Sequence, residues 1–237
     1  MSWRVPPYDA AVDEIERHVR ATYKTHGIVV AGSIVRGEAH PLSDFDIFIV
    51  HAEPWRLRDQ KFFNGVPTEI FVNPPDRIRG YFKSEHAEGR PVTAHMLTTG
   101  ELLAGADDIA HELVREAHDW VNKQPELSEN QLTSKRYAIV DWLDNARDVI
   151  ETDHATAHLL LANAVFEMAD YVFFHRRIQL PRRKVLVRTL ETVDPIAADY
   201  VRAFVTAKPD VELTIATALA KHVLGVDSFF EWTSDRS

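Results

Sequence analysis

The fold of this chain is most strongly constrained by one stretch, in which a short apolar run, a Gly-Ser pair and a second apolar run with two aspartates follow one another. Residues 28–50 read IVVAGSIVRGEAHPLSDFDIFIV. The two apolar runs predict buried strands joined by a loop. Alternate residues of a strand point to the same face, so we expect Asp44 and Asp46 to project together while Phe45 and Ile47 face the opposite layer.

Paired carboxylates in an apolar strand indicate a metal site. Two neighbouring carboxylates repel each other, and burying them unpaired is costly. A divalent cation resolves this conflict, and Mg²⁺ takes one or two carboxylates together with substrate phosphates. Glu69 lies in another apolar run, TEIFV, and supplies a third oxygen donor if the two strands are neighbours. Asp44, Asp46 and Glu69 on two strands therefore suit a two-metal centre for phosphoryl or nucleotidyl transfer.

The Gly-Ser pair predicts a phosphate-binding turn. Gly32 lets a phosphate approach the backbone, and a short helix expected over 34–38 directs its first amides toward an anion. Ser33 adds a hydroxyl donor, and Arg36 adds a positive charge one turn later. A phosphate grip followed by metal-binding carboxylates is what a nucleoside triphosphate requires.

The stretch AGSIVRGEAHPLSDFDIFIV resembles the signature of the DNA polymerase beta-like nucleotidyltransferase superfamily. In that family a serine such as Ser43 commonly precedes the first aspartate, and the third acidic residue falls on Glu69. The segment AHMLTTGELLAG, from Ala94 to Gly105, is similar to aminoglycoside or lincosamide nucleotidyltransferases. So is the part of the chain after residue 125, which has helical periodicity. The resemblance implies that ATP is the donor, that two Mg²⁺ ions assist, and that Gly32, Ser33, Arg36 and Ser43 contact the nucleotide.

The rest of the sequence predicts two domains. Up to about residue 125, helical and strand patterns alternate; from Ser128 onward only helical periodicity is found. We therefore expect an α+β protein, with a nucleotidyltransferase domain over 1–125 and a helical bundle over 126–237. The resemblance implies a mixed sheet with flanking helices in the first domain. The expected elements are helices over 8–24, 76–83, 101–122, 129–151, 154–177, 181–192, 194–206 and 211–231, and strands over 28–31, 45–51 and 67–72, the last after the hairpin signal Asn64-Gly65.

Glu167 is the candidate general base. It lies in the apolar stretch LLLANAVFEMADYVFF, where burial would raise its pKa, as suits a group that deprotonates an acceptor hydroxyl. The relatives carry an acidic residue in a comparable helix. The alternative is that Glu167, or Asp170 one turn later, forms a structural ion pair with an arginine across the bundle.

Two further groups have a functional and a structural interpretation. The run HRRIQLPRRKVLVR clusters basic residues between Arg176 and Arg188, and Lys184 is a candidate contact to the triphosphate tail; the alternative is solvated charge at helix ends. His154 and His158 are spaced i,i+4 on a helix and could share a metal. Since no third ligand is evident, we favour an exposed pair.

Composition limits the partners. The formal net charge of −9 argues against a dedicated binder of duplex nucleic acid, and the lack of cysteine excludes disulfides and thiolate zinc sites. No apolar run approaches the roughly 20 residues that span a bilayer. The N-terminus lacks a signal-peptide core, so we expect a cytoplasmic protein without a membrane partner.

These features predict a metal-dependent nucleotidyltransferase that moves AMP from ATP to a hydroxyl of a small molecule. An aminoglycoside or lincosamide antibiotic is the specific candidate, because an acidic cleft attracts polycationic drugs. One alternative is a toxin–antitoxin-type nucleotidyltransferase that modifies a protein or tRNA. The other is a catalytically silent domain that binds nucleotide as a regulator. The sequence leaves a homodimer open.

Overall fold

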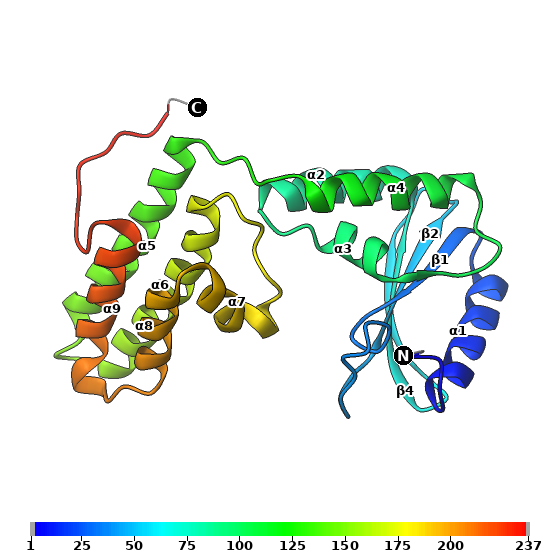
Figure 1. Ribbon diagram of the computed structural model, residues 1–237, viewed down its shortest axis with the longest axis horizontal. Coiled ribbons are helices and arrows are strands. Elements are labelled where there is room, and N and C mark those ends of the chain that lie inside the picture. The colour runs from blue at the N-terminus through cyan, green and yellow to red at the C-terminus, as the bar shows by residue number, and fades with distance from the viewer. Residues whose placement is uncertain (1–2, 236–237) are drawn as a thin grey trace. The chain divides into compact units, whose positions relative to one another are not determined.

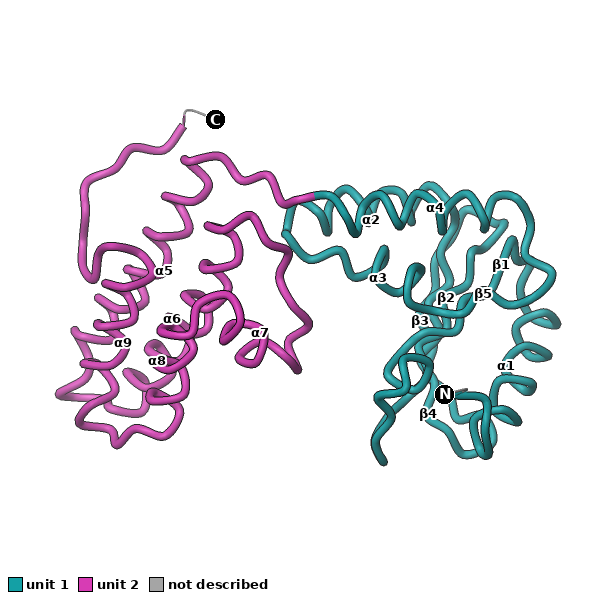
Figure 2. The backbone as a smooth tube through the Cα atoms, in the orientation of Figure 1, with its two compact units in different colours: residues 1–123 teal, residues 124–237 magenta. Residues whose placement is uncertain are grey.

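The computed structural model describes residues 3–235 and divides into two compact units, Met1–Lys123 and Gln124–Ser237 (Figure 2). The boundary expected from the sequence lies two residues further along the chain. The outermost residues of the two expected ranges, 1–2 and 236–237, lie outside the described part.

The first unit combines a five-stranded sheet with helices, as an α+β fold requires (Figure 1). Its strands follow the order β3-β4-β2-β1-β5, in which β2 and β4 are parallel and the other neighbours antiparallel, so the sheet is mixed as expected. Its elements are α1 (Tyr8–Thr22), β1 (Thr25–Ala31), β2 (Phe45–His51), β3 (Leu57–Phe63), β4 (Val66–Asn73), α2 (Pro75–Ala87), α3 (Val92–Thr99), β5 (Glu101–Leu102) and α4 (Asp108–Asn122).

Helices cover both faces of this sheet. Helix α1 buries Val12, Ile15 and Val19, which recur at helical spacing, against the face that carries Phe45 and Ile47. On the opposite face, α2, α3 and α4 pack on a cluster that includes Val29 and Phe48. Alternation along β2 therefore sends Asp46 to the face of α2–α4.

The hairpin signal is confirmed. β3 and β4 are joined by Asn64 and Gly65, whose φ angles of 45° and 76° are those of a type I′ turn. Strand β3 itself was not expected from the sequence. Its residues, LRDQKFF, are mostly exposed because β3 is an edge strand, so they lack the apolar alternation by which strands are found.

Three other expectations for local structure are corrected. Residues 33–37 form hydrogen-bonded turns in place of a short helix. The helix expected over 101–122 begins only at Asp108, because Asp107 caps it by accepting hydrogen bonds from the amides of Ile109 and Ala110. Before it, Glu101–Leu102 pairs with β1 as a short strand.

The second unit contains helices and loops, and no strand within its described residues. Helix α5 begins with a capping box made by Ser128 and Gln131, and α9 ends at Gly225, whose φ of 72° stops the helix expected to run to residue 231. Its helices are α5 (Glu129–Val149), α6 (His154–His175), the 3₁₀ turn η1 (Arg183–Val185), α7 (Leu186–Val193), α8 (Pro195–Val205) and α9 (Pro209–Leu224).

Helix α6 forms the centre of this unit. By length and composition, α6 is the one helix within residues 3–235 that could cross a membrane, which corrects the expectation that no apolar run reaches that length. However, 61% of its most apolar window is buried inside the protein. Leu161, Met168 and Phe173 are fully buried among the other helices, so α6 has the burial of a core helix.

Candidate active site

Asp46 and Glu69 lie side by side on neighbouring strands. In the parallel pairing of β2 with β4, Asp46 is the direct partner of Glu69, and on its other side Asp46 pairs with Ala31 of β1. Directly paired residues point to the same face of a sheet. The sequence expectation that the strand of Glu69 neighbours the strand of Asp46 is confirmed.

Asp44 lies outside the strand. β2 begins at Phe45, and Asp44 is exposed just before it, whereas Asp46 is half-buried. The expected strand over 45–51 is confirmed, and because Asp44 precedes it, strand alternation does not place Asp44 beside Asp46. Its exposure leaves that carboxylate hydrated, so it bears little of the desolvation cost that burial would impose.

Gly32 lies directly against these aspartates. Its φ is +104°, and a Cβ at this position would lie 3.1 Å from the backbone oxygen of Asp44 and 3.2 Å from Oδ2 of Asp46. The backbone conformation is strained for any residue with a side chain, and a Cβ would require its neighbours to move by a few tenths of an ångström. The Gly-Ser turn is thus in contact with the Asp-Phe-Asp segment, as a site for phosphates and metal would need.

The two serines of the motif also meet. The hydroxyls of Ser33 and Ser43 share a hydrogen bond of 2.8 Å, and Ser43 Oγ accepts a second from the amide of His40 at 2.9 Å. Ser43 is buried, while Ser33 is partly exposed. The loop of 34–42 is therefore closed on itself at its base by two hydroxyl groups beside Gly32 and Asp44.

The predicted positive charge of Arg36 is already paired. Arg36 Nε donates to Glu38 Oε2 at 3.1 Å. The turns that replace the expected helix are held by the amides of Arg36 and Glu38, which donate to the carbonyls of Gly32 and Ser33. Without a helix, the predicted phosphate binding would depend on individual amides and hydroxyls.

Glu69 has partners that the sequence did not reveal. Arg58 Nε donates to Glu69 Oε1 at 2.6 Å, and Gln60 Nε2 donates to the same oxygen at 3.0 Å. The Glu69 side chain is only 14% exposed. Both partners lie on β3, and they were missed because that edge strand carries no apolar alternation.

The three carboxylates match Mg²⁺ in donor type, since hard cations prefer oxygen ligands. Within residues 3–235, no three His, Asp or Glu side chains are gathered as a metal-binding group. Glu69 is engaged by Arg58 and Gln60 at Oε1. The assignment of Asp44, Asp46 and Glu69 to metal ions stays a prediction.

The burial expected for Glu167 is wrong. Glu167 is exposed on α6, and the buried carboxylate of this helix is Asp170. Asp170 Oδ1 accepts a 2.7 Å hydrogen bond from Arg183 Nη1, and the Arg183 guanidinium also lies 4.0 Å from the ring centroid of Phe166. The structural alternative, an arginine paired across the bundle, is therefore confirmed for Asp170.

The basic run contributes to the packing of the second unit. Arg183 pairs with Asp170, and Arg176 Nη2 lies 3.2 Å from Asp194 Oδ2. Lys184 is exposed in η1, which at three residues is too short to direct amides toward an anion. The assignment of Lys184 to the triphosphate stays a prediction.

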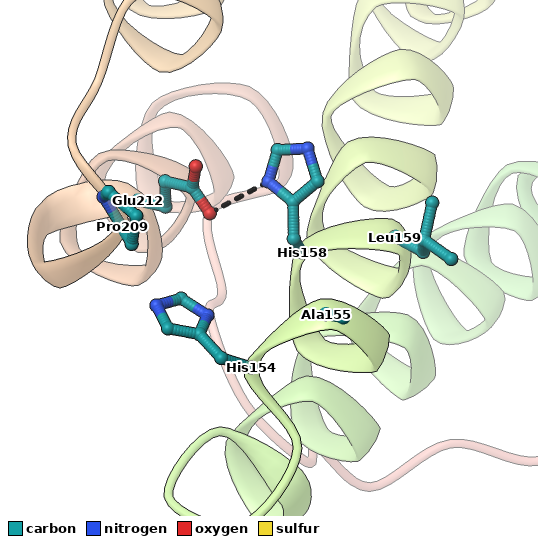
Figure 3. A pocket seen from close by; sticks show the side chains of 6 residues that line it. All are labelled: His154, Ala155, His158, Leu159, Pro209 and Glu212. Carbon is teal, nitrogen blue, oxygen red and sulfur yellow. Dashed lines mark hydrogen bonds and ion pairs between the residues drawn. The ribbon is translucent and has the colours of Figure 1, made fainter.

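His154 and His158 line a cavity of about 420 Å³ in the second unit, together with Glu212 (Figure 3). His158 Nδ1 lies 2.9 Å from Oε2 of the buried Glu212, and the His158 ring stacks on Phe204. Both histidines are exposed, and they belong to no three-residue metal group in the described chain. The favoured interpretation, an exposed pair, agrees with this arrangement, with His158 oriented by a carboxylate.

Comparisons with known proteins identify the first unit. Residues 12–93 match the family model of the nucleotidyltransferase domain, and this segment contains Gly32, Ser33, Asp44, Asp46 and Glu69. It is therefore a nucleotidyltransferase domain of the DNA polymerase beta-like superfamily, as the sequence motif indicated. Such a domain is that of a transferase that moves nucleotidyl groups.

A solved structure shares the fold. It is a nucleotidyltransferase-like protein from Exiguobacterium sibiricum 255-15, with a TM-score of 0.56 and 10% identity over 92% of this chain and 74% of the other. At this identity the likeness concerns the fold alone. No curated protein matches the sequence.

Proposed function

We propose that the protein is a Mg²⁺-dependent nucleotidyltransferase that transfers AMP from ATP to a hydroxyl group of a small molecule. The observation that carries the proposal is the contact of Gly32 with Asp44 and Asp46, in the same row of the sheet as Glu69. It joins a turn suited to phosphates to the carboxylates suited to metal. The family match to residues 12–93 supports the reaction class.

The chain's own groups would bind the triphosphate at the start of β2. Gly32 gives this turn no side chain that would keep a phosphate from the backbone, and the hydroxyls of Ser33 and Ser43 meet next to it. Arg36 would contribute charge by releasing Glu38 and binding a phosphate oxygen in its place. One ion pair near the surface would then replace another. These groups place the β- and γ-phosphates at the Gly32 end of the site.

Asp44 and Asp46 would hold the Mg²⁺ ions, and Glu69 would join them as its bonds to Arg58 and Gln60 loosen. When bound, the ions supply charge stabilisation for the α-phosphate and the leaving pyrophosphate. The acceptor hydroxyl oxygen forms a bond to the α-phosphorus, and the bond from that phosphorus to the bridging oxygen breaks. Its electron pair leaves with pyrophosphate, and the hydroxyl proton passes to a carboxylate base.

Glu167 remains our candidate for that base, on different grounds from those of the sequence. It is exposed and therefore accessible, while its neighbour Asp170 is buried and paired with Arg183. We assign catalysis to the domain 1–125. Lys184, in the helical domain 126–237, stays our candidate for a contact to the nucleotide, and we place the reaction in the cytoplasm, where ATP is available.

The proposal is tested by incubating the protein with Mg²⁺, each nucleoside triphosphate in turn, and a panel of acceptors. Pyrophosphate release and the mass of each acceptor are measured. The panel includes aminoglycosides, a lincosamide, tRNA and proteins, so that the toxin–antitoxin alternative is scored in the same experiment. A gain of one nucleoside monophosphate on a small molecule supports the proposal. A gain on tRNA or protein alone supports that alternative.

A matched pair of variants controls the test. Asp46→Asn removes one charge from the proposed metal site, whereas Asp119→Asn makes the same change on the exposed surface of α4. We expect only Asp46→Asn to lose transfer. Metal-independent nucleotide binding without turnover on any acceptor would instead favour a silent regulator.

A further inference from the structure

A second cavity lies in the first unit, on the same sheet face as Asp46 and Glu69. Its volume is about 420 Å³, within the range of about 300–1,000 Å³ that is typical of small-molecule sites. It is lined by Phe48 and Phe71 of the sheet, by Arg56 just before β3 and Arg58 within it, and by Val92 and Met96 of α3, with further residues from α2. We call it the Phe71 pocket.

The pocket directly follows Asp46 and Glu69 along the strands, and we call these two paired residues the carboxylate row. Phe48 is two residues after Asp46 on β2, Phe71 is two residues after Glu69 on β4, and the two phenylalanines are direct partners in the parallel pairing. Two residues of a strand span about 7 Å. Arg58 joins the two places, because it donates to Glu69 and its guanidinium lies 5.0 Å from the centroid of the Phe71 ring.

The phosphate turn lies at the other end of that row. β1 runs antiparallel to β2 and ends at Ala31 beside Asp46, so Gly32 and Ser33 lie toward the start of β2. The Phe71 pocket lies in the opposite direction along β2 and β4. The order along this face is therefore Ser33 and Gly32, then Asp46 and Glu69, then Phe48 and Phe71.

This order has a consequence for nucleotidyl transfer. Attacking and leaving oxygens lie roughly in line on either side of the reacting phosphorus. If pyrophosphate leaves at the Gly32 end, the acceptor hydroxyl approaches the α-phosphorus from the side of Phe48 and Phe71. A molecule seated in the Phe71 pocket, about 7 Å beyond the carboxylate row, would extend its hydroxyl in that direction.

The lining indicates the chemistry of the molecule that fits. Phe48, Phe71 and Met96 offer apolar and aromatic surface for a flat ring. The rim carries Arg56, whose Nη1 donates to the hydroxyl of Tyr81 at 2.9 Å, and Arg58, which is paired with Glu69. Among the described residues that line the pocket, Glu85 supplies the one carboxyl group, which is engaged by the amide and hydroxyl of Thr93, both at 2.7 Å.

We propose that the Phe71 pocket is the acceptor site and that it takes a hydroxylated aromatic compound that is neutral or anionic. This inference rests on the proposed function and narrows it, because Arg56 at the rim disfavours a polycation such as an aminoglycoside, while Arg58 is already paired with Glu69. The aromatic ring packs on Phe71, an anionic substituent faces Arg56, and the hydroxyl faces the carboxylate row.

The test uses three probes that share one phenol ring and differ in charge: 4-hydroxybenzoate, 4-hydroxybenzyl alcohol and tyramine. Their affinities are measured by calorimetry on the full chain, with Mg²⁺ and a non-hydrolysable ATP analogue present, and kanamycin is titrated as the polycation. We expect 4-hydroxybenzoate to bind about tenfold more tightly than tyramine, which is ~1.4 kcal/mol. Tighter binding of tyramine or kanamycin would overturn the proposal.

Two variants locate the binding. Val92→Trp fills the pocket from an exposed position of α3, and Ile109→Trp places the same side chain on an exposed position of α4 outside the pocket. Only Val92→Trp should abolish binding of 4-hydroxybenzoate. Arg56→Glu should reverse the order of 4-hydroxybenzoate and tyramine, and an unchanged order would contradict the assignment.

The same titrations separate this inference from the proposed function. If Val92→Trp weakens binding of the ATP analogue itself, the pocket holds the donor nucleoside and the acceptor assignment is wrong. If Val92→Trp leaves transfer to every acceptor unchanged, the assignment is also wrong, although nucleotidyl transfer stands. If Asp46→Asn still transfers nucleotide, the proposed function fails, while the charge preference of the pocket is still read from the probes.

Discussion

Asp46 of β2 is the direct strand partner of Glu69 of β4, although 22 residues and a whole hairpin separate them along the chain. The parallel pairing of β2 with β4 brings them together. Strand β3, which lies between β2 and β4 in the sequence, forms the outer edge of the sheet beside β4. Gly32 completes the arrangement from the turn that follows β1, on the other side of β2. Two neighbouring strands and this turn thus each contribute one residue to the same place.

Replacing Gly32 tests this arrangement. We expect Gly32→Ala to lower the free energy of unfolding by about 1–3 kcal/mol, since its φ of +104° is unfavourable for alanine. The added Cβ would also press on Asp46 Oδ2, so the affinity for Mg²⁺ and ATP should fall. Urea unfolding and nucleotide titration measure the two effects.

Gly80→Ala is the matched control for that substitution. Gly80 lies in α2, and a Cβ there would meet nothing within 4 Å. We expect this variant to be more stable by about 0.4–1 kcal/mol and to bind nucleotide as the unmodified protein does. If both glycine variants behave alike, the contact between Gly32 and Asp46 has no special role.

Glu69 offers a second test. We expect Glu69→Gln to raise the Mg²⁺ concentration needed for half-maximal transfer, because an amide is a poorer ligand than a carboxylate for a hard cation. Glu112→Gln, on the exposed surface of α4, should leave the Mg²⁺ dependence unchanged. Measuring initial rates over a series of Mg²⁺ concentrations distinguishes the two, and equal curves would remove Glu69 from the metal site.

The sequence predicted the parts of this site that depend on local pattern. Gly32, Ser33 and the aspartates stand out because glycine and carboxylates interrupt apolar strands. Strand β3 could not be predicted, because an edge strand with polar side chains on both faces has no period to detect. For that reason Arg58 and Gln60, which hold Glu69, were missed, and so was the Phe71 pocket beside them.

The helical half shows a different limit. Periodicity places residues on a helix face, yet Glu167 and Asp170 are only three positions apart within a nearly continuous apolar run. Neighbours from other helices decide which of the two is buried. The partner of Asp170, Arg183, comes from a segment 13 residues later, and no local signal connects them.

This contrast leads to a prediction for the two acids of α6. Asp170→Asn should destabilise the protein by about 1–3 kcal/mol, because it leaves the hydrogen-bonding groups of Arg183 without a charged partner. Glu167→Gln should change stability by less than about 0.5 kcal/mol, as is usual for an exposed site. If Glu167 is the base, this second variant alone should lose transfer while keeping the affinity for ATP. Urea unfolding and steady-state kinetics of both variants provide the comparison.

The last prediction concerns pH and Glu85. Burial, as the largest cause, raises the pKa of the Glu85 carboxyl above its ordinary value of 4.5, and the charge of Glu88 adds to the rise. The folded state therefore binds this proton more tightly than the unfolded chain does, so the contribution of Glu85 to stability is full below the unfolded pKa and is lost as pH rises through the folded pKa.

Glu85→Gln keeps an acceptor for Thr93 but cannot ionise. We expect its unfolding free energy to fall less than that of the unmodified protein between about pH 4 and pH 7. Chemical denaturation over that range measures the difference, and parallel curves would show that Glu85 does not titrate with folding.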